Sequence, residues 1–270
     1  MHTVILIPTW NNSELLAKCL TALNRLDPQP DKYVFLENNS TDNTLEVIQS
    51  FNRPKELIRL WFRDDARYVL DSPYALIAIV RQYLLKRARQ LNPDFAIFID
   101  DDIVVGSKDL IPKLTRWKQY GYDIAGGPYY RRYPEGVFLA SMWKHPKGGY
   151  TYRNQCISFV DFPEVTSAGC MCLSRDIIQD KRVNFYPLCE EGHAEDYGYC
   201  YQARKLGYKI ILDCTLRIGH HFKLFPYRPW TVMPNGQGIK FSYGVSKRDI
   251  EEIERQCALL KRMEQLLGGE

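Results

Sequence analysis

An apolar run at residues 95–99 leads directly into three consecutive carboxylates, Asp100, Asp101 and Asp102. The length of the run and its Phe and Ile content predict a buried central strand. Three ionised acids cannot share a dry core, because like charges at such short range raise each other's pKa and cost energy. In an open α/β sheet, ligands bind in the crevice at the carboxyl ends of the strands. This run therefore predicts either a divalent-metal site at that edge or a solvated acidic turn.

Strand-like and helix-like segments alternate on the N-terminal side of this run. Strands are expected at 3–8, 33–36 and 57–62, and a segment with helical periodicity follows each of them. The third helix begins at Ser72 and Pro73, which suit the N-cap and the first helical position. This alternation predicts right-handed βαβ units and a mostly parallel sheet flanked by helices.

The second half of the chain is less regular. A strand is expected at 168–173, followed by a helix that begins near Glu195 and ends at Gly207. The chain has no internal repeat and no low-complexity linker, so one domain is expected over residues 1–245.

The C-terminal segment 246–270 carries apolar residues at helical spacing and is expected to form an amphipathic helix. A stripe of that width usually docks on its own domain. Dimerisation and contact with a membrane surface are the alternatives for this helix.

Composition excludes several classes of protein. The chain has 270 residues and a formal net charge of +4, with acids and bases mixed along it, which does not indicate a nucleic-acid partner. Its eight cysteines form no Cys-x-x-Cys pair, so a zinc ribbon has no support. No apolar run approaches about 18 residues, so no transmembrane helix is expected. Without an N-terminal signal sequence, a cytoplasmic protein is expected, or one peripheral to a membrane.

Four stretches of the chain stand in an order that resembles the family 2-type glycosyltransferases with the GT-A fold. The resemblance covers residues 3–221. It implies an α/β fold with a single GT-A domain built on a Rossmann-like central sheet. Residues 1–104 would form the half that binds a nucleotide sugar, and residues 105–245 the half that binds the acceptor.

The first two stretches resemble the nucleotide-binding signatures of that family. The loop of the first lies against the base and the ribose, and an acid of the second accepts the N–H of a uracil or guanine edge. Here Glu37 and Asn38 stand in place of two acids, which leaves the base open. The residues of the first stretch are Pro8, Thr9, Trp10 and Asn11.

Arg81 and the three acids resemble the diphosphate and metal site. Arg81 falls where the family often has Arg-Asn, and its guanidinium would face the diphosphate. The acids resemble the Asp-x-Asp motif, which implies that Asp102 ligates a divalent metal bridging the two donor phosphates. Asp100 would approach the ribose or a metal-bound water, and Asp101 belongs to the same donor-binding segment.

Glu195 and Asp196 resemble the Glu-Asp helix of the family, in which the Asp is the general base for the acceptor hydroxyl. The pattern departs from the family at Gly198 and Gln202. Two acids at a helix N-terminus also suit the helix dipole without any catalytic role.

His220 and His221 fall where a histidine completes the metal site in the metal-dependent branch, and His220 is the better placed. Mixed Asp and His ligation favours Mn²⁺ over Mg²⁺. The expected acceptor contacts, from composition alone, are Tyr129, Arg131 and Trp143.

The resemblance implies transfer of a sugar from a nucleoside-diphosphate sugar to a hydroxyl of a glycan, lipid-linked or protein acceptor. An Asp base implies inversion, and the lack of Gln-x-x-Arg-Trp argues for single additions. Two alternatives remain. One is a haloacid-dehalogenase-like phosphatase with Asp100 as nucleophile, and the other is a non-catalytic GT-A protein that binds nucleotide or glycan.

Overall fold

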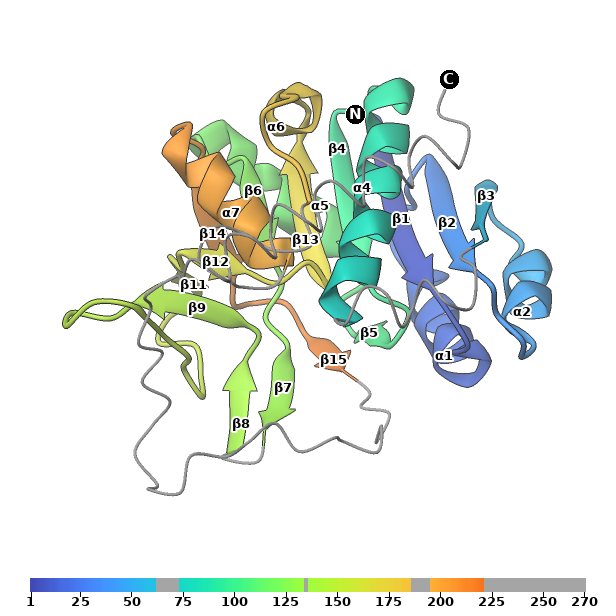
Figure 1. The fold of residues 1–270 in the computed structure, drawn as a ribbon, viewed down its shortest axis with the longest axis horizontal. Helices are drawn as coiled ribbons and strands as arrows, with labels where there is room; N and C mark the ends of the chain where they lie inside the picture. Colours follow the sequence, from blue (N-terminus) through green and yellow to red (C-terminus); the bar gives the residue numbers. More distant parts are fainter. Residues whose placement is uncertain (62–72, 134–135, 186–194, 221–270) are drawn as a thin grey trace, which may run out of the picture.

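In the part of the chain that the structure describes, the central sheet has eight strands (Figure 1). Their order is β11 (Val160–Asp161), β14 (Ile210–Asp213), β6 (Ile124–Gly126), β13 (Cys170–Ser174), β4 (Phe95–Ile99), β1 (Thr3–Thr9), β2 (Lys32–Asn38) and β3 (Lys55–Leu60). The computed structural model describes residues 1–61, 73–133, 136–185 and 195–220. Strands β1, β2, β3 and β4 run parallel to one another. Strand β13 is antiparallel to both β4 and β6, and the edge strand β11 is antiparallel to β14. The mostly parallel sheet expected from the sequence is therefore confirmed.

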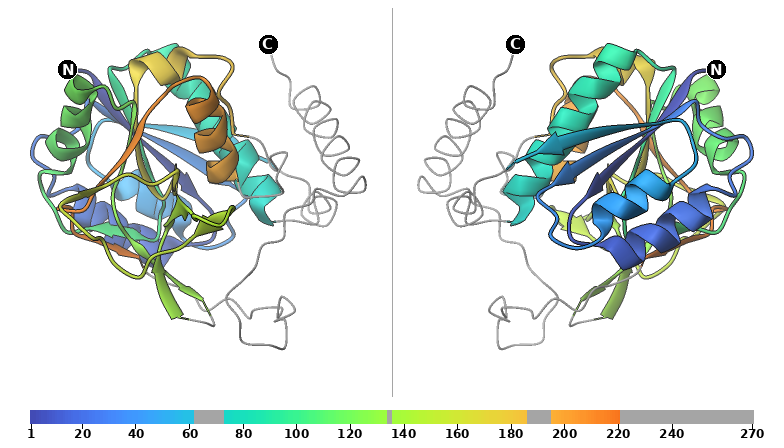
Figure 2. Two further views of the ribbon diagram at one scale, coloured as in Figure 1. Left: turned by 90° about the vertical axis from the view of Figure 1, so that its left-hand side faces the viewer. Right: turned by 90° about the vertical axis from the view of Figure 1, so that its right-hand side faces the viewer.

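Helices cover both faces of this sheet (Figure 2). Residues of α1 (Ser13–Leu23), α2 (Thr44–Ser50) and α5 (Leu110–Thr115) pack against one face. Residues of α4 (Pro73–Leu91), α6 (Arg175–Gln179) and α7 (Glu195–Lys205) pack against the other. A short 3₁₀ helix, η1 (Arg116–Tyr120), follows α5.

Strand β1 shows why its sequence is apolar without interruption. Val4 and Leu6 belong to the core under α4, whereas Ile5 and Ile7 belong to the core under α1. All four side chains are fully buried. Successive side chains of a strand point to opposite faces, so a strand covered on both faces needs apolar residues at every position.

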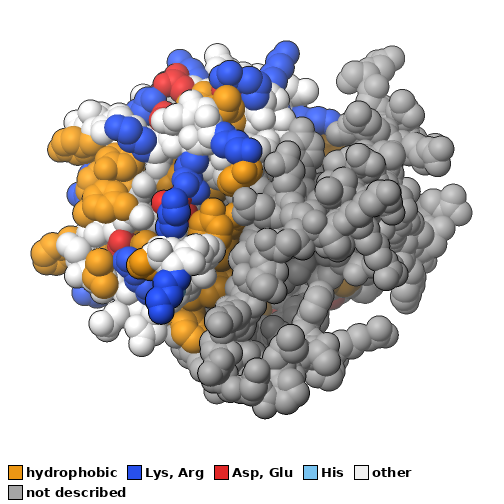
Figure 3. All heavy atoms as spheres, turned by 60° about the vertical axis from the view of Figure 1, so that its left-hand side comes forward, with side chains coloured by type: hydrophobic (Ala, Val, Ile, Leu, Met, Phe, Trp, Pro, Cys, Tyr) orange, Lys and Arg blue, Asp and Glu red, His pale blue; other side chains and the backbone are white. Residues whose placement is uncertain are grey.

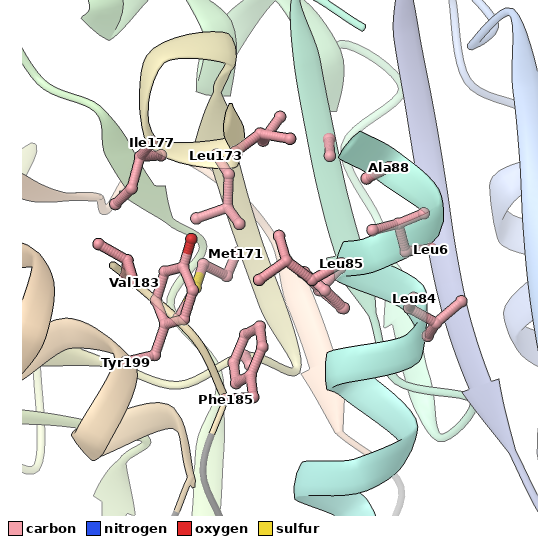
Figure 4. Close-up of a cluster of buried hydrophobic side chains, with 14 of the residues drawn as sticks. Leu6, Leu84, Leu85, Ala88, Met171, Leu173, Ile177, Val183, Phe185 and Tyr199 are labelled. Carbon is pink, nitrogen blue, oxygen red and sulfur yellow. The ribbon is translucent and has the colours of Figure 1, made fainter. Parts of the chain in front are cut away.

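Aromatic packing fixes α7 against the centre of the sheet (Figure 4). The Phe185 ring stacks on Tyr199 of α7 at a centroid distance of 4.4 Å, and meets Phe98 of β4 edge-on at 5.2 Å. Gly207, at φ +90°, follows the end of the helix, as predicted. The N-terminus of α7 is thereby held close to the carboxyl end of β4.

Short strands extend the carboxyl-end edge of the sheet. Strand β5 (Ile103–Val105) begins immediately after the three acids and pairs antiparallel with β15 (Ile218–His220). This pairing sets His220 opposite Ile103, next to the acids. The remaining strands are β7 (Tyr130–Tyr133), β8 (Gly136–Leu139), β9 (Ser141–Lys144), β10 (Tyr150–Thr151) and β12 (Val165–Thr166).

Among the predicted features, the N-cap Ser72, His221 and the C-terminal helix 246–270 lie outside the described residues. Within the described ranges, no helix has the length and apolar character needed to cross a membrane. The division of the domain near residue 104 stays a prediction.

Candidate active site

A cavity of about 350 Å³ opens at the carboxyl ends of β1, β2 and β4, beside α4 and the first turn of α7. It lies at the edge of the sheet that the acidic run predicts. Its walls combine apolar residues of α4 with acids from β4 and α7. The residues lining it are Pro8, Thr9, Trp10, Asn38, Leu76, Ile77, Val80, Arg81, Asp100, Asp101, Asp102, Glu195 and Asp196.

Asp100 is held by a buried guanidinium. Arg81 Nη2 donates to both carboxylate oxygens of Asp100, at 2.7 and 2.9 Å, and Arg81 Nη1 lies 3.1 Å from Glu195 Oε1. The Arg81 side chain is only 3% exposed. Burial alone would lower the pKa of Arg81, but the carboxylates of Asp100, Glu195 and Asp196 raise it. One permanent cation thus joins α4, the end of β4 and α7. Contact of Arg81 with a diphosphate stays a prediction.

Asp101 turns back toward the loop after β1. Its Oδ2 accepts a hydrogen bond from Thr9 Oγ1 and its Oδ1 accepts one from Asn12 Nδ2, both at 2.7 Å. Burial, followed by repulsion from Asp102, raises the pKa of Asp101 to about 7, and the two hydrogen bonds oppose that rise. Asp101 therefore ties the ends of β1 and β4 together. Nothing in the sequence separates this role of Asn12 from that of an ordinary helix cap.

Asp102 faces His220, 118 residues away in the chain. Its Oδ2 lies 3.2 Å from His220 Nε2, and the other ring nitrogen, Nδ1, lies 3.0 Å from the Tyr130 carbonyl oxygen. The β5–β15 pairing brings the two side chains together. Two of the predicted metal ligands are thus neighbours. Among the described residues, however, no group of three His, Cys, Asp or Glu side chains is arranged to hold a metal ion.

Gly169 leaves the space that Asp100 occupies. The carbonyl of Gly169 accepts from the Asp100 N–H at 3.1 Å. A Cβ at Gly169 would lie 2.4 Å from the Tyr129 hydroxyl and 3.0 Å from Asp100 Oδ2. This role of Gly169 could not be predicted from the sequence, because a glycine before a strand carries no signal of what lies beside it.

Glu195 and Asp196 occupy the first turn of α7 and are both buried in the cavity wall. Glu195 forms an ion pair with the Arg81 guanidinium, whereas Asp196 Oδ1 accepts a hydrogen bond from the Tyr197 N–H at 2.8 Å. The two adjacent acids therefore have different partners, and the general-base role of Asp196 stays a prediction.

The loop after β1 lies partly in the cavity and partly behind it. Pro8, Thr9 and Trp10 line the cavity. Asn11, at φ +45°, instead accepts the Thr41 N–H on its Oδ1 at 2.6 Å. Asn11 therefore joins this loop to the loop after β2 and is not among the cavity-lining residues.

Glu37 and Asn38, at the end of β2, differ in the same way. Asn38 lines the cavity. Glu37 is fully buried, accepts the Ser40 N–H, and pairs with Arg59 Nε at 3.1 Å. Arg59 is its register partner on β3, which only the pairing of the strands reveals. A direct contact between Glu37 and a base stays a prediction.

Two of the three expected acceptor contacts lie in the packed interior. The Tyr129 hydroxyl is buried and hydrogen-bonds Ser167 Oγ at 2.6 Å, and Trp143 Nε1 donates to Asp161 Oδ1 at 3.0 Å. Aromatic content alone cannot separate surface rings from core rings. The side chain of Arg131 lies outside the described part of the chain.

Comparison with known proteins gives one family and one fold. The model of the family described as glycosyl transferase family 2 matches residues 4–180. A poly(ribitol-phosphate) beta-glucosyltransferase from Bacillus spizizenii is 23% identical over 188 residues, which are 68% of this chain and 27% of that protein. The chain thus spans less than a third of that relative's length.

Solved structures of low sequence identity share the fold. S. aureus TarS 1-349 in complex with UDP-GlcNAc matches with a TM-score of 0.58 and 16% identity, covering 96% of this chain and 66% of TarS 1-349. GalNAc-T7 with UDP, GalNAc and Mn²⁺ matches with a TM-score of 0.61 and 12% identity, covering 96% of this chain and 48% of the GalNAc-T7 chain. The mannosyltransferase PcManGT from Pyrobaculum calidifontis, with GDP-Man and Mn²⁺, matches with a TM-score of 0.53 and 13% identity, covering 81% of this chain and 56% of the PcManGT chain. The fold is the expected GT-A fold, and, since the family model spans more than half of the sequence, the chain belongs to glycosyl transferase family 2, a family of glycosyltransferases.

Proposed function

We propose that this chain is a metal-dependent glycosyltransferase that moves a sugar from a nucleoside-diphosphate sugar to an acceptor hydroxyl, with inversion and one sugar at a time. The observation that carries the proposal is the convergence of three elements on one cavity. The β1 loop, the acids after β4 and the first turn of α7 all line it. Three structural neighbours hold UDP, UDP-GlcNAc, or GDP-Man with Mn²⁺, which supports a nucleotide-sugar donor for this fold.

Asp102 and His220 suit a divalent cation by the chemistry of their facing atoms. The Tyr130 carbonyl can only accept a hydrogen bond, so His220 Nδ1 carries the hydrogen and a neutral ring keeps its lone pair on Nε2. The ionised Asp102 carboxylate also only accepts, so these two atoms, 3.2 Å apart, need a cation or a proton between them. Asp102 and His220 would hold the metal, with Mn²⁺ preferred because of the imidazole nitrogen. When bound, the metal would supply positive charge to the diphosphate leaving group.

The nucleoside is assigned to the part of the cavity formed by the β1 loop and the end of β2. Pro8 and Trp10 offer apolar surfaces to a base, and the Asn38 amide can donate or accept at a base edge. Glu37 contributes indirectly, because its carboxylate fixes the turn after Asn38 through Ser40 and Arg59.

Asp196 is assigned as the general base. The acceptor oxygen attacks the anomeric carbon, the bond from that carbon to the diphosphate breaks, and the hydroxyl proton passes to the Asp196 carboxylate. Attack from the side opposite the leaving group inverts the anomeric configuration. The Tyr197 N–H holds Asp196 Oδ1, and the second carboxylate oxygen has no hydrogen-bond partner among the residues described. Glu195, which already pairs with Arg81, orients the turn that carries the base.

The experiment measures release of nucleoside diphosphate from a panel of UDP- and GDP-sugars with Mn²⁺. In Asp196→Asn, turnover should fall by at least about 100-fold, because general-base catalysis contributes that much or more. The thermal shift caused by the nucleoside diphosphate should stay unchanged. The matched control is Glu46→Gln, an exposed acid in the first turn of α2, which should keep full turnover. Unchanged turnover in Asp196→Asn would contradict the base assignment.

The same assay separates the two alternatives. A phosphatase that uses Asp100 would release inorganic phosphate without cleaving a sugar nucleotide. The geometry opposes this reading, because Arg81 already engages both oxygens of Asp100. A binding protein would show the nucleotide-induced thermal shift with no turnover of any donor.

A further inference from the structure

Large apolar side chains are exposed around the edge strand β11 and at the end of η1. Ile157, Phe159 and Phe162, on the chain between β10 and β12, are 69%, 79% and 57% exposed. The Phe162 ring stacks on the half-buried Tyr122 at a centroid distance of 6.0 Å and an interplanar angle of 28°. Tyr120, at the end of η1, is 63% exposed. These five residues are called the apolar patch.

Contacts between Tyr120 and Tyr122 run through Trp117, which lies 5.9 Å from the first ring and 6.5 Å from the second, centroid to centroid. The patch is therefore continuous from η1 to Phe162. Monomeric proteins seldom expose large contiguous apolar areas, and such areas usually mark an interaction site.

Polar contacts hold the loop of residues 157–162, which carries Ile157, Phe159 and Phe162 of the patch, in place. Asp161 Oδ1 accepts from Trp143 Nε1 at 3.0 Å and from the Phe162 N–H at 2.9 Å, and Arg153 Nη1 bonds both Asp161 oxygens at 3.0 and 2.8 Å. The Phe159 carbonyl accepts from the Cys214 N–H at 3.0 Å. The loop is thus anchored at two points with its apolar side chains directed outward.

Two ion pairs beside the patch have their cations outside and their anions inside. Arg116 is 40% exposed whereas its partner Asp213 is 0% exposed, and Arg153 is 33% exposed whereas its partner Asp161 is 5% exposed. Lysines on the neighbouring β9–β10 hairpin, Lys144 and Lys147, are also exposed. Figure 3 brings forward the side of the molecule that carries β9 and β11 in Figure 1, and it shows hydrophobic side chains with Lys and Arg between them and few Asp or Glu.

We infer that the apolar patch docks the protein on an anionic phospholipid surface. Phe and Ile side chains enter the boundary between headgroups and acyl chains, Tyr rings suit the headgroup level, and Arg and Lys meet lipid phosphates. A second copy of the chain fits this surface less well, because a two-fold contact would bury the exposed cations against a surface that shows few anions to pair with them. The inference does not rest on the proposed function, since none of the patch residues is among those lining the cavity.

Vesicle flotation of the full chain tests this inference. The wild type should float with vesicles of phosphatidylglycerol and phosphatidylcholine, and remain unbound with phosphatidylcholine alone, because the cations require anionic lipid. The double variant Phe159→Ser/Phe162→Ser should bind the anionic vesicles at least about tenfold more weakly, given the apolar area of two phenylalanines. Its melting temperature and its nucleotide-induced thermal shift should match the wild type, which separates loss of docking from misfolding.

The matched control is Trp61→Ser. Trp61 is 64% exposed and follows β3, at the edge of the sheet opposite to β11, so this variant should float like the wild type. Three results would overturn the inference: no flotation of the wild type with anionic vesicles, equal flotation of the double variant, or equal weakening by Trp61→Ser. Light scattering that shows a wild-type dimer lost in the double variant, without vesicle binding, would assign the patch to self-association instead.

Discussion

Replacing Arg81 by Met tests whether the buried guanidinium holds the site together. The substitution keeps an unbranched apolar chain but removes the charge that pairs with Asp100 and Glu195. Breaking a buried ion pair by removing one partner costs about 3–5 kcal/mol, because the remaining charge is left without compensation. Asp100 keeps some contact with water, at 23% side-chain exposure, so the lower end of that range is expected. Urea denaturation at pH 7 measures the loss.

A matched control comes from a surface pair. Lys18 and Glu14 lie 2.6 Å apart, but their side chains are 48% and 80% exposed. Lys18→Met should therefore reduce the free energy of unfolding by less than about 0.5 kcal/mol.

A second substitution tests whether the loss of stability comes from the carboxylates that Arg81→Met leaves without a counter-charge. Adding Glu195→Gln to Arg81→Met removes one uncompensated charge, so the double variant should regain more than about 1 kcal/mol relative to Arg81→Met. The reasoning would be refuted if Arg81→Met lowered the free energy of unfolding by less than about 1 kcal/mol. It would also be refuted if the change in the double variant equalled the sum of the changes in Arg81→Met and Glu195→Gln.

Three further predictions concern a glycine, the metal site and a surface pair. Gly169→Ala places a Cβ 2.4 Å from the Tyr129 hydroxyl, so urea denaturation should show a loss of about 1–3 kcal/mol, and an unchanged midpoint would contradict the crowding. His220→Ala should weaken Mn²⁺ at least about tenfold in a thermal-shift titration, and a full shift in that variant would exclude His220 as a ligand. The Arg87 guanidinium, with hydrogen bonds of 2.6 and 3.0 Å, holds the pKa of Glu56 below its usual range. A lowered acid pKa stabilises the fold above the unfolded-state pKa and loses its effect as pH falls through the folded-state pKa. Arg87→Met should therefore cost about 0.5–1 kcal/mol at pH 7 and progressively less as the pH falls below the unfolded-state pKa of a glutamate, about 4.3. A cost in urea titrations that does not decrease as the pH falls below that value would contradict the assignment.

The glycine prediction has a control within the same sheet edge. A Cβ at Gly219 would find its nearest neighbour at 3.7 Å, an ordinary contact. Gly219→Ala should therefore change the free energy of unfolding by less than about 0.5 kcal/mol.

Much of the N-terminal half of the fold follows from the sequence because β1, β2 and β4 are buried on both faces, whereas the edge strand β3 is only partly buried. The apolar run at the start of the chain is a strand for that reason, and the same holds for Phe95–Ile99. The direction of β13 could not be predicted, because a strand covered on both faces has the same residue pattern whichever way it runs. Strand β6 has three residues, Ile124–Gly126, which is too short for a periodicity.

Some residues of the site could be predicted from the sequence, and others could not. Residues next to each other in sequence, such as Glu195 and Asp196, were found from local motifs, and the structure puts both in the cavity wall. Pairings made by strand register were not found. Glu37 meets Arg59 across β2 and β3, and no pattern within either strand reveals that contact.

The three acids after β4 end in three different arrangements, and the difference bears on where a cation can bind. Asp100 holds a buried and permanently charged guanidinium, which an added ion cannot displace without stranding a charge. Asp101 uses both oxygens on neutral donors from the β1 loop, and those bonds join two strands. Asp102 faces a histidine, whose neutral ring has a nitrogen lone pair that can share a metal. A divalent ion between Asp102 and His220 would replace the contact between these two side chains. An ion at Asp100 or Asp101 would instead break contacts that join separate elements, which supports Asp102 as the ligand among three adjacent and chemically identical side chains.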